Sequence, residues 1–278
     1  MRTNTSRTPS RLAPAALALL VALASCKREQ PAPTSSATPP PPALPATAPG
    51  FELKDVTERT QDYIVGISYP PVANQYPPLA TELKRYADAA RADLLEAAKG
   101  REKSAGAAPY ELVLPFTQTH VSPTLVVVGV DGSSYTGGAH GAPLIARWVW
   151  LPQQNRMLRA SDLVADAKGW EAISSLVREQ LHTALSQRVD ADELPPAERV
   201  EVLKSANRMI EDGTEPDPGH FSQFEPLVAS NGRIRALRFV FPPYQVGPYS
   251  DGTQTVEVPA VALLPHIAPA YRSLFEGG

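Results

Sequence analysis

A glycine-rich segment, residues 133–141, carries side chains that could recognise a partner. Its candidate binding residues are Tyr135, Thr136, Gly137, Gly138 and His140. Glycine permits positive φ angles and lets another chain approach the backbone closely. We therefore predict a turn that presents an aromatic ring, a hydroxyl and an imidazole to a ligand. The alternative is a tight hairpin with a purely structural role.

A second candidate segment, residues 241–252, places two tyrosines on a loop that contains three prolines. Its candidate binding residues are Pro243, Tyr244, Pro248 and Tyr249. A stiff loop that presents tyrosine loses little conformational entropy on docking, which is typical of binding surfaces. The alternative is that both tyrosines cover the hydrophobic core of their own domain.

The spacing of polar residues indicates neither a metal site nor a catalytic motif. The five histidines lie at least 20 residues apart, and residues 132–136 lack the second glycine of a nucleophile elbow. No glycine-rich phosphate loop occurs. We therefore expect no cofactor, no metal and no enzymatic activity. An alternative is an envelope polysaccharide hydrolase, which requires His140 within about 3 Å of Ser133, Ser134 or an acid.

The composition excludes several classes of protein. The chain has 278 residues, a formal net charge of −3 and a single cysteine. One cysteine cannot form an intramolecular disulfide, and the absence of a basic surplus argues against a nucleic-acid partner. The 30 prolines are about twice the average share, so their placement matters.

The first fifty residues are typical of an exported, tethered protein. Residues 1–25 combine three arginines with an apolar run, as a lipoprotein signal peptide does, and Cys26 follows Leu23-Ala24-Ser25 as in a lipobox. Lipidation of Cys26 would make the membrane a partner. Residues 26–50 are then a proline-rich, disordered linker. Lys27 after the cysteine favours the outer membrane, facing the periplasm or the surface, over the inner membrane.

The rest of the chain alternates between strand and helix patterns. Apolar periodicity predicts helices at residues 77–100, 169–188 and 196–210, and a closing helix from Pro259. It predicts strands at residues 63–69, 110–119, 124–130, 144–150, 224–229, 233–241 and 253–258, with 125–128 as a buried central strand. Asn231-Gly232 predicts a two-residue hairpin turn. Because the helices come in blocks, we expect an α+β fold with antiparallel sheets and packed helices.

Both candidate segments resemble signatures of known domain families. Residues 135–140 (YTGGAH) resemble the signature of the DUF4163 region, and residues 241–252 with 256–259 resemble that of DUF3298. Residues 158–163 match the step that leads into a helix in that family. The resemblance implies a DUF4163-like region over residues 51–155 and a DUF3298-like region over residues 156–278.

The resemblance also implies a function. The RsiV-like extracellular domains of this family include a lysozyme-binding anti-sigma factor, and a related region occurs in a peptidoglycan deacetylase. The chain is therefore expected to be a lipid-anchored, non-catalytic envelope protein that binds a lysozyme-like muramidase or peptidoglycan. The alternatives are the hydrolase that uses His140 and a structural envelope scaffold.

Overall fold

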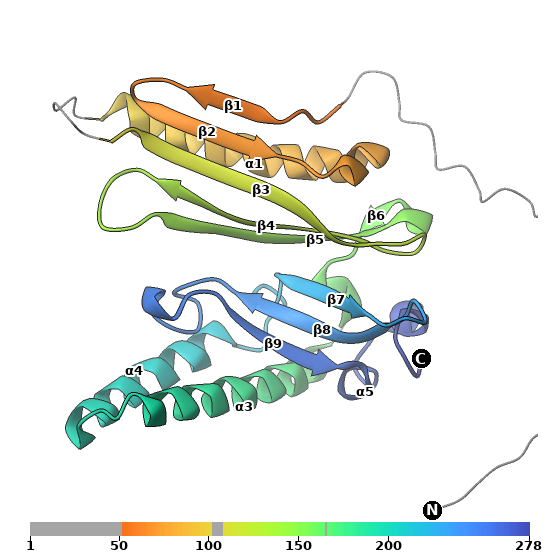
Figure 1. Cartoon of the computed structure of the whole chain (residues 1–278). Helices are drawn as coiled ribbons and strands as arrows, with labels where there is room; N and C mark the ends of the chain where they lie inside the picture. Colours follow the sequence, from red (N-terminus) through yellow and green to blue (C-terminus); the bar gives the residue numbers. More distant parts are fainter. Residues whose placement is uncertain (1–51, 102–107, 165) are drawn as a thin grey trace, which may run out of the picture. The chain divides into compact units, whose positions relative to one another are not determined.

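Segments with alternating apolar residues form the strands of two β-sheets, and segments with helical apolar spacing form the helices that pack on these sheets (Figure 1). The computed structural model describes residues 52–101, 108–164 and 166–278. The expected signal peptide, Cys26 and the linker at 26–50 lie outside the described residues. No helix among the described residues is long and apolar enough to cross a membrane.

The first sheet has six strands in sequence order. They are β1 (Val56–Arg59), β2 (Tyr63–Ser68), β3 (Tyr110–Val121), β4 (Val126–Tyr135), β5 (Ala142–Leu151) and β6 (Arg156–Met157). The second sheet contains β7 (Phe224–Val228), β8 (Ile234–Phe241) and β9 (Gln254–Pro259). The helices are α1 (Pro77–Lys99), α2 (Ala160–Leu163), α3 (Ala167–Ala191), α4 (Pro196–Gly213) and α5 (Ala260–Leu263). Both sheets belong to one compact unit.

The six-stranded sheet is mixed rather than antiparallel throughout. Strands β2 and β3 run parallel, while every other neighbouring pair is antiparallel. A parallel pair needs a long crossover, and the 23-residue helix α1 supplies it. The α+β class predicted from the sequence is confirmed, but the expectation of antiparallel sheets misses this one pair.

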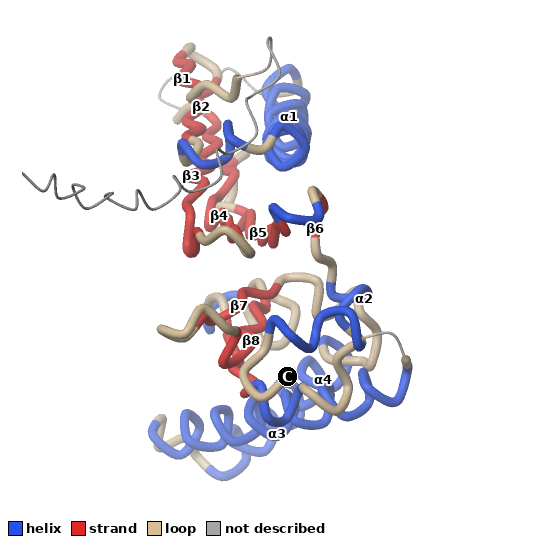
Figure 2. Tube along the Cα trace, turned by 90° about the vertical axis from the view of Figure 1, so that its right-hand side faces the viewer, coloured by secondary structure: helices blue, strands red, loops and turns tan. Residues whose placement is uncertain are grey.

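Strand β4 lies in the middle of the molecule and is buried on both faces. Val126 and Val128 belong to the core beneath α1, whereas Val127 belongs to the core shared with the second sheet. Successive side chains of a strand point to opposite faces, so a continuous apolar run suits a strand between two cores. Figure 2 shows α1 on one face of the six-stranded sheet and α3 and α4 against the second sheet.

Helix α3 begins at Ala167, two residues before the predicted start at residue 169. Residues 160–163 form the short helix α2, and Asp166 caps α3 by accepting a hydrogen bond from the Gly169 amide at 2.7 Å. From there Ile173 and Val177 enter the same core as Phe221 and Phe239 of the second-sheet region. The amphipathic pattern therefore predicts the helix, which extends beyond the predicted residues 169–188 at both ends.

The turn between β7 and β8 differs from the predicted two-residue hairpin. The Ala229 amide donates to the Arg233 carbonyl at 2.8 Å, which leaves three residues in the loop. A type I′ turn requires positive φ at both central residues, but of Asn231 and Gly232 only the glycine has it, at 79°. The chain instead forms a three-residue loop, which needs a positive φ angle at only one residue, here Gly232.

The predicted closing helix is also wrong in extent. Helix α5 has four residues, and a separate 3-10 turn covers Pro269–Leu274. Pro265 and Pro269 cannot donate backbone hydrogen bonds, so a continuous helix would lose two of them. Buried Phe275 instead anchors the C-terminal segment through a bridge beside Ile234 at the start of β8.

Candidate binding site

The first candidate segment becomes the end of a hairpin. Residues 133–135 complete β4 rather than joining the turn, and β5 begins at Ala142. Gly137 and Gly138 adopt φ angles of 97° and 95°, which allow the chain to reverse. The Tyr135 hydroxyl donates to the Gly138 carbonyl at 3.2 Å. Tyr135 thus holds the turn in place.

The second candidate segment is a loop held in an unusual conformation. Tyr244 has a φ of 74°, which is rare for a residue with a side chain. Its amide donates to the Gly247 carbonyl at 2.9 Å, and the Gln245 amide donates to the Pro242 carbonyl at 3.1 Å. Such strain persists where the surroundings over-determine the backbone, and it is concentrated at functional sites.

Contacts with α3 and α4 hold the backbone of the Tyr244 loop in this conformation. The Gln245 side-chain amide donates to the carbonyl of Gly213, the last residue of α4, at 2.9 Å. Asp251 pairs with Arg188 of α3, and the Asp251 side chain is 11% exposed. Val246 is buried in the core. The loop is therefore a fixed part of the domain surface.

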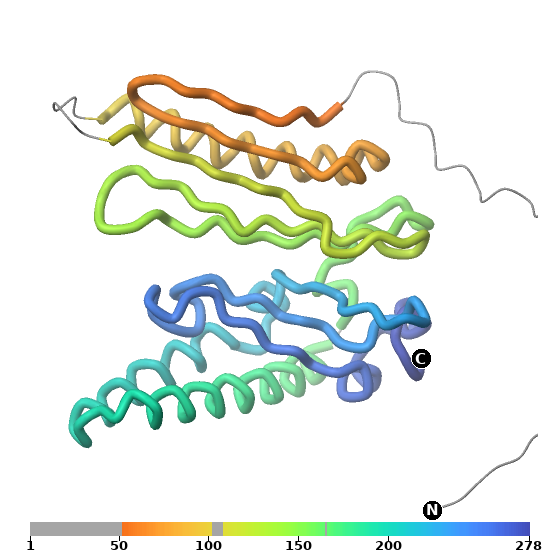
Figure 3. Tube along the Cα trace, in the orientation of Figure 1, coloured from red at the N-terminus to blue at the C-terminus, as the bar shows by residue number. Residues whose placement is uncertain are grey.

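The structure brings the two segments together, although they lie about a hundred residues apart (Figure 3). The rings of His140 and Tyr249 stack with centroids 3.8 Å apart and an interplanar angle of 13°. The Tyr244 hydroxyl lies 3.4 Å from His140 Nε2, and its ring lies 5.8 Å from that of Tyr249. We call these three residues the aromatic cluster.

Two grooves flank the aromatic cluster. One, of about 360 Å³, is lined by five predicted residues: Thr136, Gly137, His140, Pro243 and Tyr244. The other, of about 310 Å³, includes Tyr249, and Pro143 contributes to both. Tyr244 is 56% exposed, so its ring is available to a partner.

Three of the predicted residues lie outside both grooves. Tyr135 and Gly138 shape the turn through their mutual hydrogen bond. Pro248 is exposed and precedes the 3-10 turn that carries Tyr249. These residues position the aromatic cluster without lining its grooves.

The hydrolase alternative requires a serine or an acid beside His140, but the ring nitrogens of His140 face other atoms. Nδ1 lies 3.2 Å from the Gly141 carbonyl, and Nε2 faces the Tyr244 hydroxyl. Neither Ser133, Ser134 nor an acid is a hydrogen-bond partner of His140 within the described residues. Nor do those residues contain a group of three or more histidines, cysteines or acids that could hold a metal.

Sequence reasoning missed a buried ionic link between the sheets. Arg147 of β5 pairs with Glu225 of β7, and their side chains are only 7% and 10% exposed. Arg147 also binds Asp131 at 2.8 Å, and its backbone amide donates to the Gln223 side chain at 2.7 Å. An arginine between buried Ala146 and Trp148 was the one signal in the sequence for such a pair.

Glu225 extends this link across the second sheet. Its carboxylate lies 3.5 Å from Arg238 of β8, which in turn binds Glu257 of β9 at 2.7 Å. The hydrogen bond to Glu257 raises the pKa of Arg238 above its ordinary value. Close by, His120 lines the same small cavity as Glu225, and burial lowers its pKa. Its Nε2 atom is buried without a hydrogen-bond partner in the described part of the chain.

Comparison with known proteins identifies part of the chain. Residues 161–260 match the family model for DUF3298, a protein family of unknown function, and they include the loop that carries Tyr244 and Tyr249. Residues 135–140 lie outside the matched range. No curated protein matches the sequence.

Two solved structures of DUF3298 family proteins are similar to the chain. The protein of Bacteroides fragilis is 16% identical, with a TM-score of 0.47 over 78% of this chain and 93% of that one. The protein of Pseudomonas aeruginosa is 15% identical, with a TM-score of 0.48 over 80% of this chain and 95% of that one. On the evidence of the family match, the chain contains a DUF3298 domain over residues 161–260.

Proposed function

We propose that this chain is a lipid-anchored, non-catalytic binding protein of the cell envelope, whose aromatic cluster recognises a lysozyme-like muramidase or peptidoglycan. The observation that carries the proposal is the meeting of His140 with Tyr244 and Tyr249. Two segments distant in sequence converge there on one exposed surface. If both segments served only to shape the fold, their aromatic rings would be expected to pack inward.

The energetics of the cluster favour a role in recognition. Exposed aromatic contacts contribute little to folding, because much of their surface stays in water. The strained backbone at Tyr244 has a cost of its own, of the order of 1 to 3 kcal/mol. Pre-ordered tyrosines lose little entropy on binding, so the same arrangement favours association.

The shape of the surface and the net charge of the mature chain suit the proposed partners. The flat rings and the neighbouring groove can accept a sugar face or a protruding loop of a protein. Cleavage before Cys26 would leave 23 basic and 29 acidic residues, a formal charge of −6. A negative protein associates faster with a cationic lysozyme through electrostatic steering.

The cellular location is part of the same proposal. Lipidation at Cys26 would tether the domain to the outer membrane, facing the periplasm or the surface, with residues 26–50 as a spacer. Residues 51–155 would form the DUF4163-like region that supplies His140 to the site.

Fractionation of cells that express the full chain tests the anchor. A Cys26→Ser variant is expected to leave the membrane fraction and to lose metabolic labelling with palmitate, because no thiol remains to be lipidated. A Ser35→Ala variant in the linker is the control and should stay labelled and membrane-bound. Labelling of the Cys26→Ser variant, or its retention in the membrane fraction, would contradict the proposed anchor.

Titration with purified partners tests the recognition claim. Wild-type protein, a Tyr244→Ala/Tyr249→Ala double variant and a Val261→Ala control are titrated with a panel of lysozymes and with soluble peptidoglycan fragments. Val261 is 78% exposed on α5, away from both loops, so its removal should leave binding unchanged. We expect the double variant to bind at least tenfold more weakly. Absence of binding at micromolar protein, or equal binding by all three proteins, overturns the proposal.

A further inference from the structure

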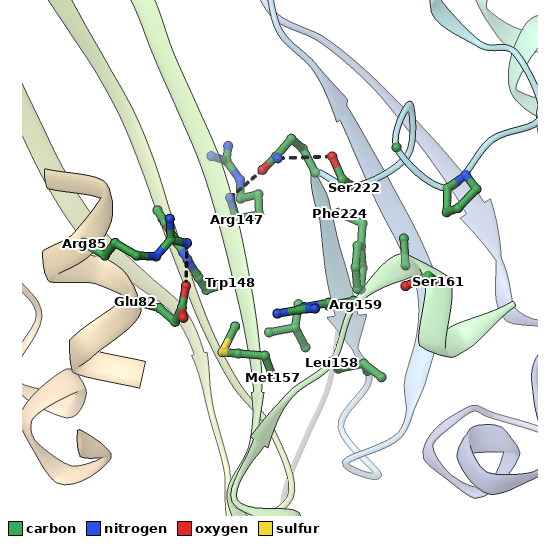
Figure 4. A pocket seen from close by; sticks show the side chains of 15 residues that line it. Glu82, Arg85, Arg147, Trp148, Met157, Leu158, Arg159, Ser161, Ser222 and Phe224 are labelled. Atoms are coloured by element: carbon green, nitrogen blue, oxygen red, sulfur yellow. Dashed lines mark hydrogen bonds and ion pairs between the residues drawn. The ribbon is translucent and has the colours of Figure 1, made fainter. Parts of the chain in front are cut away.

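A larger cavity, of about 500 Å³, lies apart from the aromatic cluster (Figure 4). It forms where β5 and β6 meet α1 and the segment that leads into β7. None of its lining residues belongs to the two grooves beside the aromatic cluster. Its volume is within the range of pockets that bind small ligands.

Apolar side chains form much of the cavity wall. Trp148 of β5 and Met157 of β6 line the cavity on the side of α1, whereas Phe224 of β7 lines it from the other side of β5 (Figure 4). Trp148 is 9% exposed and Phe224 is 2% exposed, so both are held firmly by the cores behind them. Phe224 therefore offers a ligand almost no surface, and the apolar contact area comes from partly exposed Met157 and the edge of Trp148.

Three arginines line the cavity, but they differ in what they already bind. Arg147 is fully engaged, because its guanidinium contacts Glu225, Asp131 and two backbone carbonyls. Arg85 pairs with Glu82 at 2.7 Å on the exposed surface of α1. Exposed ion pairs of this kind are weak, so Arg85 is only partly neutralised.

Arg159 is the remaining arginine, and it makes no ion pair with any described residue. The acid nearest in sequence, Asp162, binds Arg156 at 2.8 Å and accepts from the Arg159 backbone amide at 3.0 Å. Figure 4 shows the Arg159 side chain extending across the cavity toward the side that carries Trp148. Its guanidinium therefore offers a positive charge beside an apolar wall.

Polar groups complete the lining. Ser161 and Ser222 contribute hydroxyls, and Gln223 binds Ser222 at 3.3 Å. A guanidinium suits a carboxylate in bidentate geometry, and hydroxyls suit the amide groups of a peptide. An apolar side chain next to the carboxylate would meet the wall formed by Trp148 and Met157.

We propose that this cavity binds the C-terminal carboxylate of a short peptide whose last residue is apolar. Arg159 pairs with the carboxylate, and the apolar wall holds the terminal side chain. Glu82 opposes binding because it competes for Arg85 and repels the incoming charge. The site is independent of the aromatic cluster and of its proposed partners.

Calorimetric titration of the full chain with acetyl-Ala-Ala-Leu tests this proposal, with the same peptide as its C-terminal amide for comparison. The free acid is expected to bind at least tenfold more tightly than the amide, since one charge-assisted pair is lost. This comparison needs no variant and so is independent of any folding defect. Octanoate provides a carboxylate on an apolar chain without peptide groups.

Variants then test which residue supplies the positive charge that binds the carboxylate. Arg159→Gln should bind the acid about as weakly as wild-type protein binds the amide, and Glu82→Gln should bind it more tightly. Arg208→Gln, an exposed arginine of α4 outside every cavity described above, is the control and should bind as wild type does. Equal binding of acid and amide, undetectable binding at about 10 mM, an unaffected Arg159→Gln variant, or octanoate binding as tight as the peptide would each overturn the proposal.

Discussion

Two of the contacts between the six-stranded sheet and the DUF3298 domain differ in kind, since one is a buried ion pair and the other is a group of exposed aromatic rings. In the middle of β5, Arg147 and Glu225 form a buried ionic link with side chains no more than 10% exposed. Just before β5 begins, His140 meets Tyr249 and Tyr244 at the surface. The buried link leaves no charge available to a ligand, whereas the aromatic cluster leaves rings open to one.

This difference indicates which of the two contacts contributes more to the stability of the fold. A buried charge that loses its partner is left without hydration, so breaking the pair is costly. An exposed ring that loses its neighbour is simply hydrated. We therefore expect stability to depend on the ionic link and partner binding to depend on the aromatic cluster.

The largest effect should come from Arg147→Leu. Glu225 would then be buried with only Arg238 beside it, at 3.5 Å, and we expect a loss of about 3–5 kcal/mol in the free energy of unfolding. Urea denaturation followed by circular dichroism measures this. The Arg147→Leu/Glu225→Leu double variant should recover part of the loss, because no unpaired charge remains. A single variant as stable as wild type would show that the link is not structural.

Gly213→Ala should have the next largest effect, because it acts on the support of the Tyr244 loop. A Cβ atom at Gly213 would lie 2.0 Å from the Gln245 carbonyl oxygen, so the loop must move. We expect a loss of about 1–3 kcal/mol in stability together with weaker binding of the partner. Denaturation and titration on the same preparation measure both. Unchanged binding would mean that recognition does not require the loop in this position.

The His140→Ala variant should distinguish most clearly between an effect on folding stability and an effect on partner binding. It removes the stack with Tyr249, and we expect the free energy of unfolding to fall by no more than about 1 kcal/mol. Partner affinity should nevertheless fall at least tenfold in the lysozyme or peptidoglycan titration. A large loss of stability with intact affinity would reverse the roles that we assign to the two contacts.

The smallest effect concerns His120, which lies beside the ionic link. Burial lowers the pKa of His120 below its ordinary value of 6.5, so on acidification the unfolded chain takes up this proton before the folded chain does. Stability should therefore fall as the pH drops below about 6.5. Urea denaturation at several pH values should show a shallower decline for His120→Phe than for wild type. Parallel curves for the two proteins would contradict the assignment.

Local patterns were enough to predict most elements and to single out the two loops that carry His140, Tyr244 and Tyr249. Helix α1 was predicted within one residue of its end, and the apolar run at the start of β4 was correctly assigned to a buried central strand. Both depend on periodicity within a few residues, which a single sequence displays. The closing helix failed because Pro265 and Pro269 interrupt an otherwise apolar segment.

What the sequence determined by itself is therefore the set of elements and the two loops rich in glycine, proline and tyrosine. Only the tertiary structure decided that His140 meets Tyr244 and that Arg147 meets Glu225, across separations of 104 and 78 positions in the chain. Such contacts depend on strand order and register. Periodicity specifies which face of an element is buried, but it carries no information about which distant element covers that face.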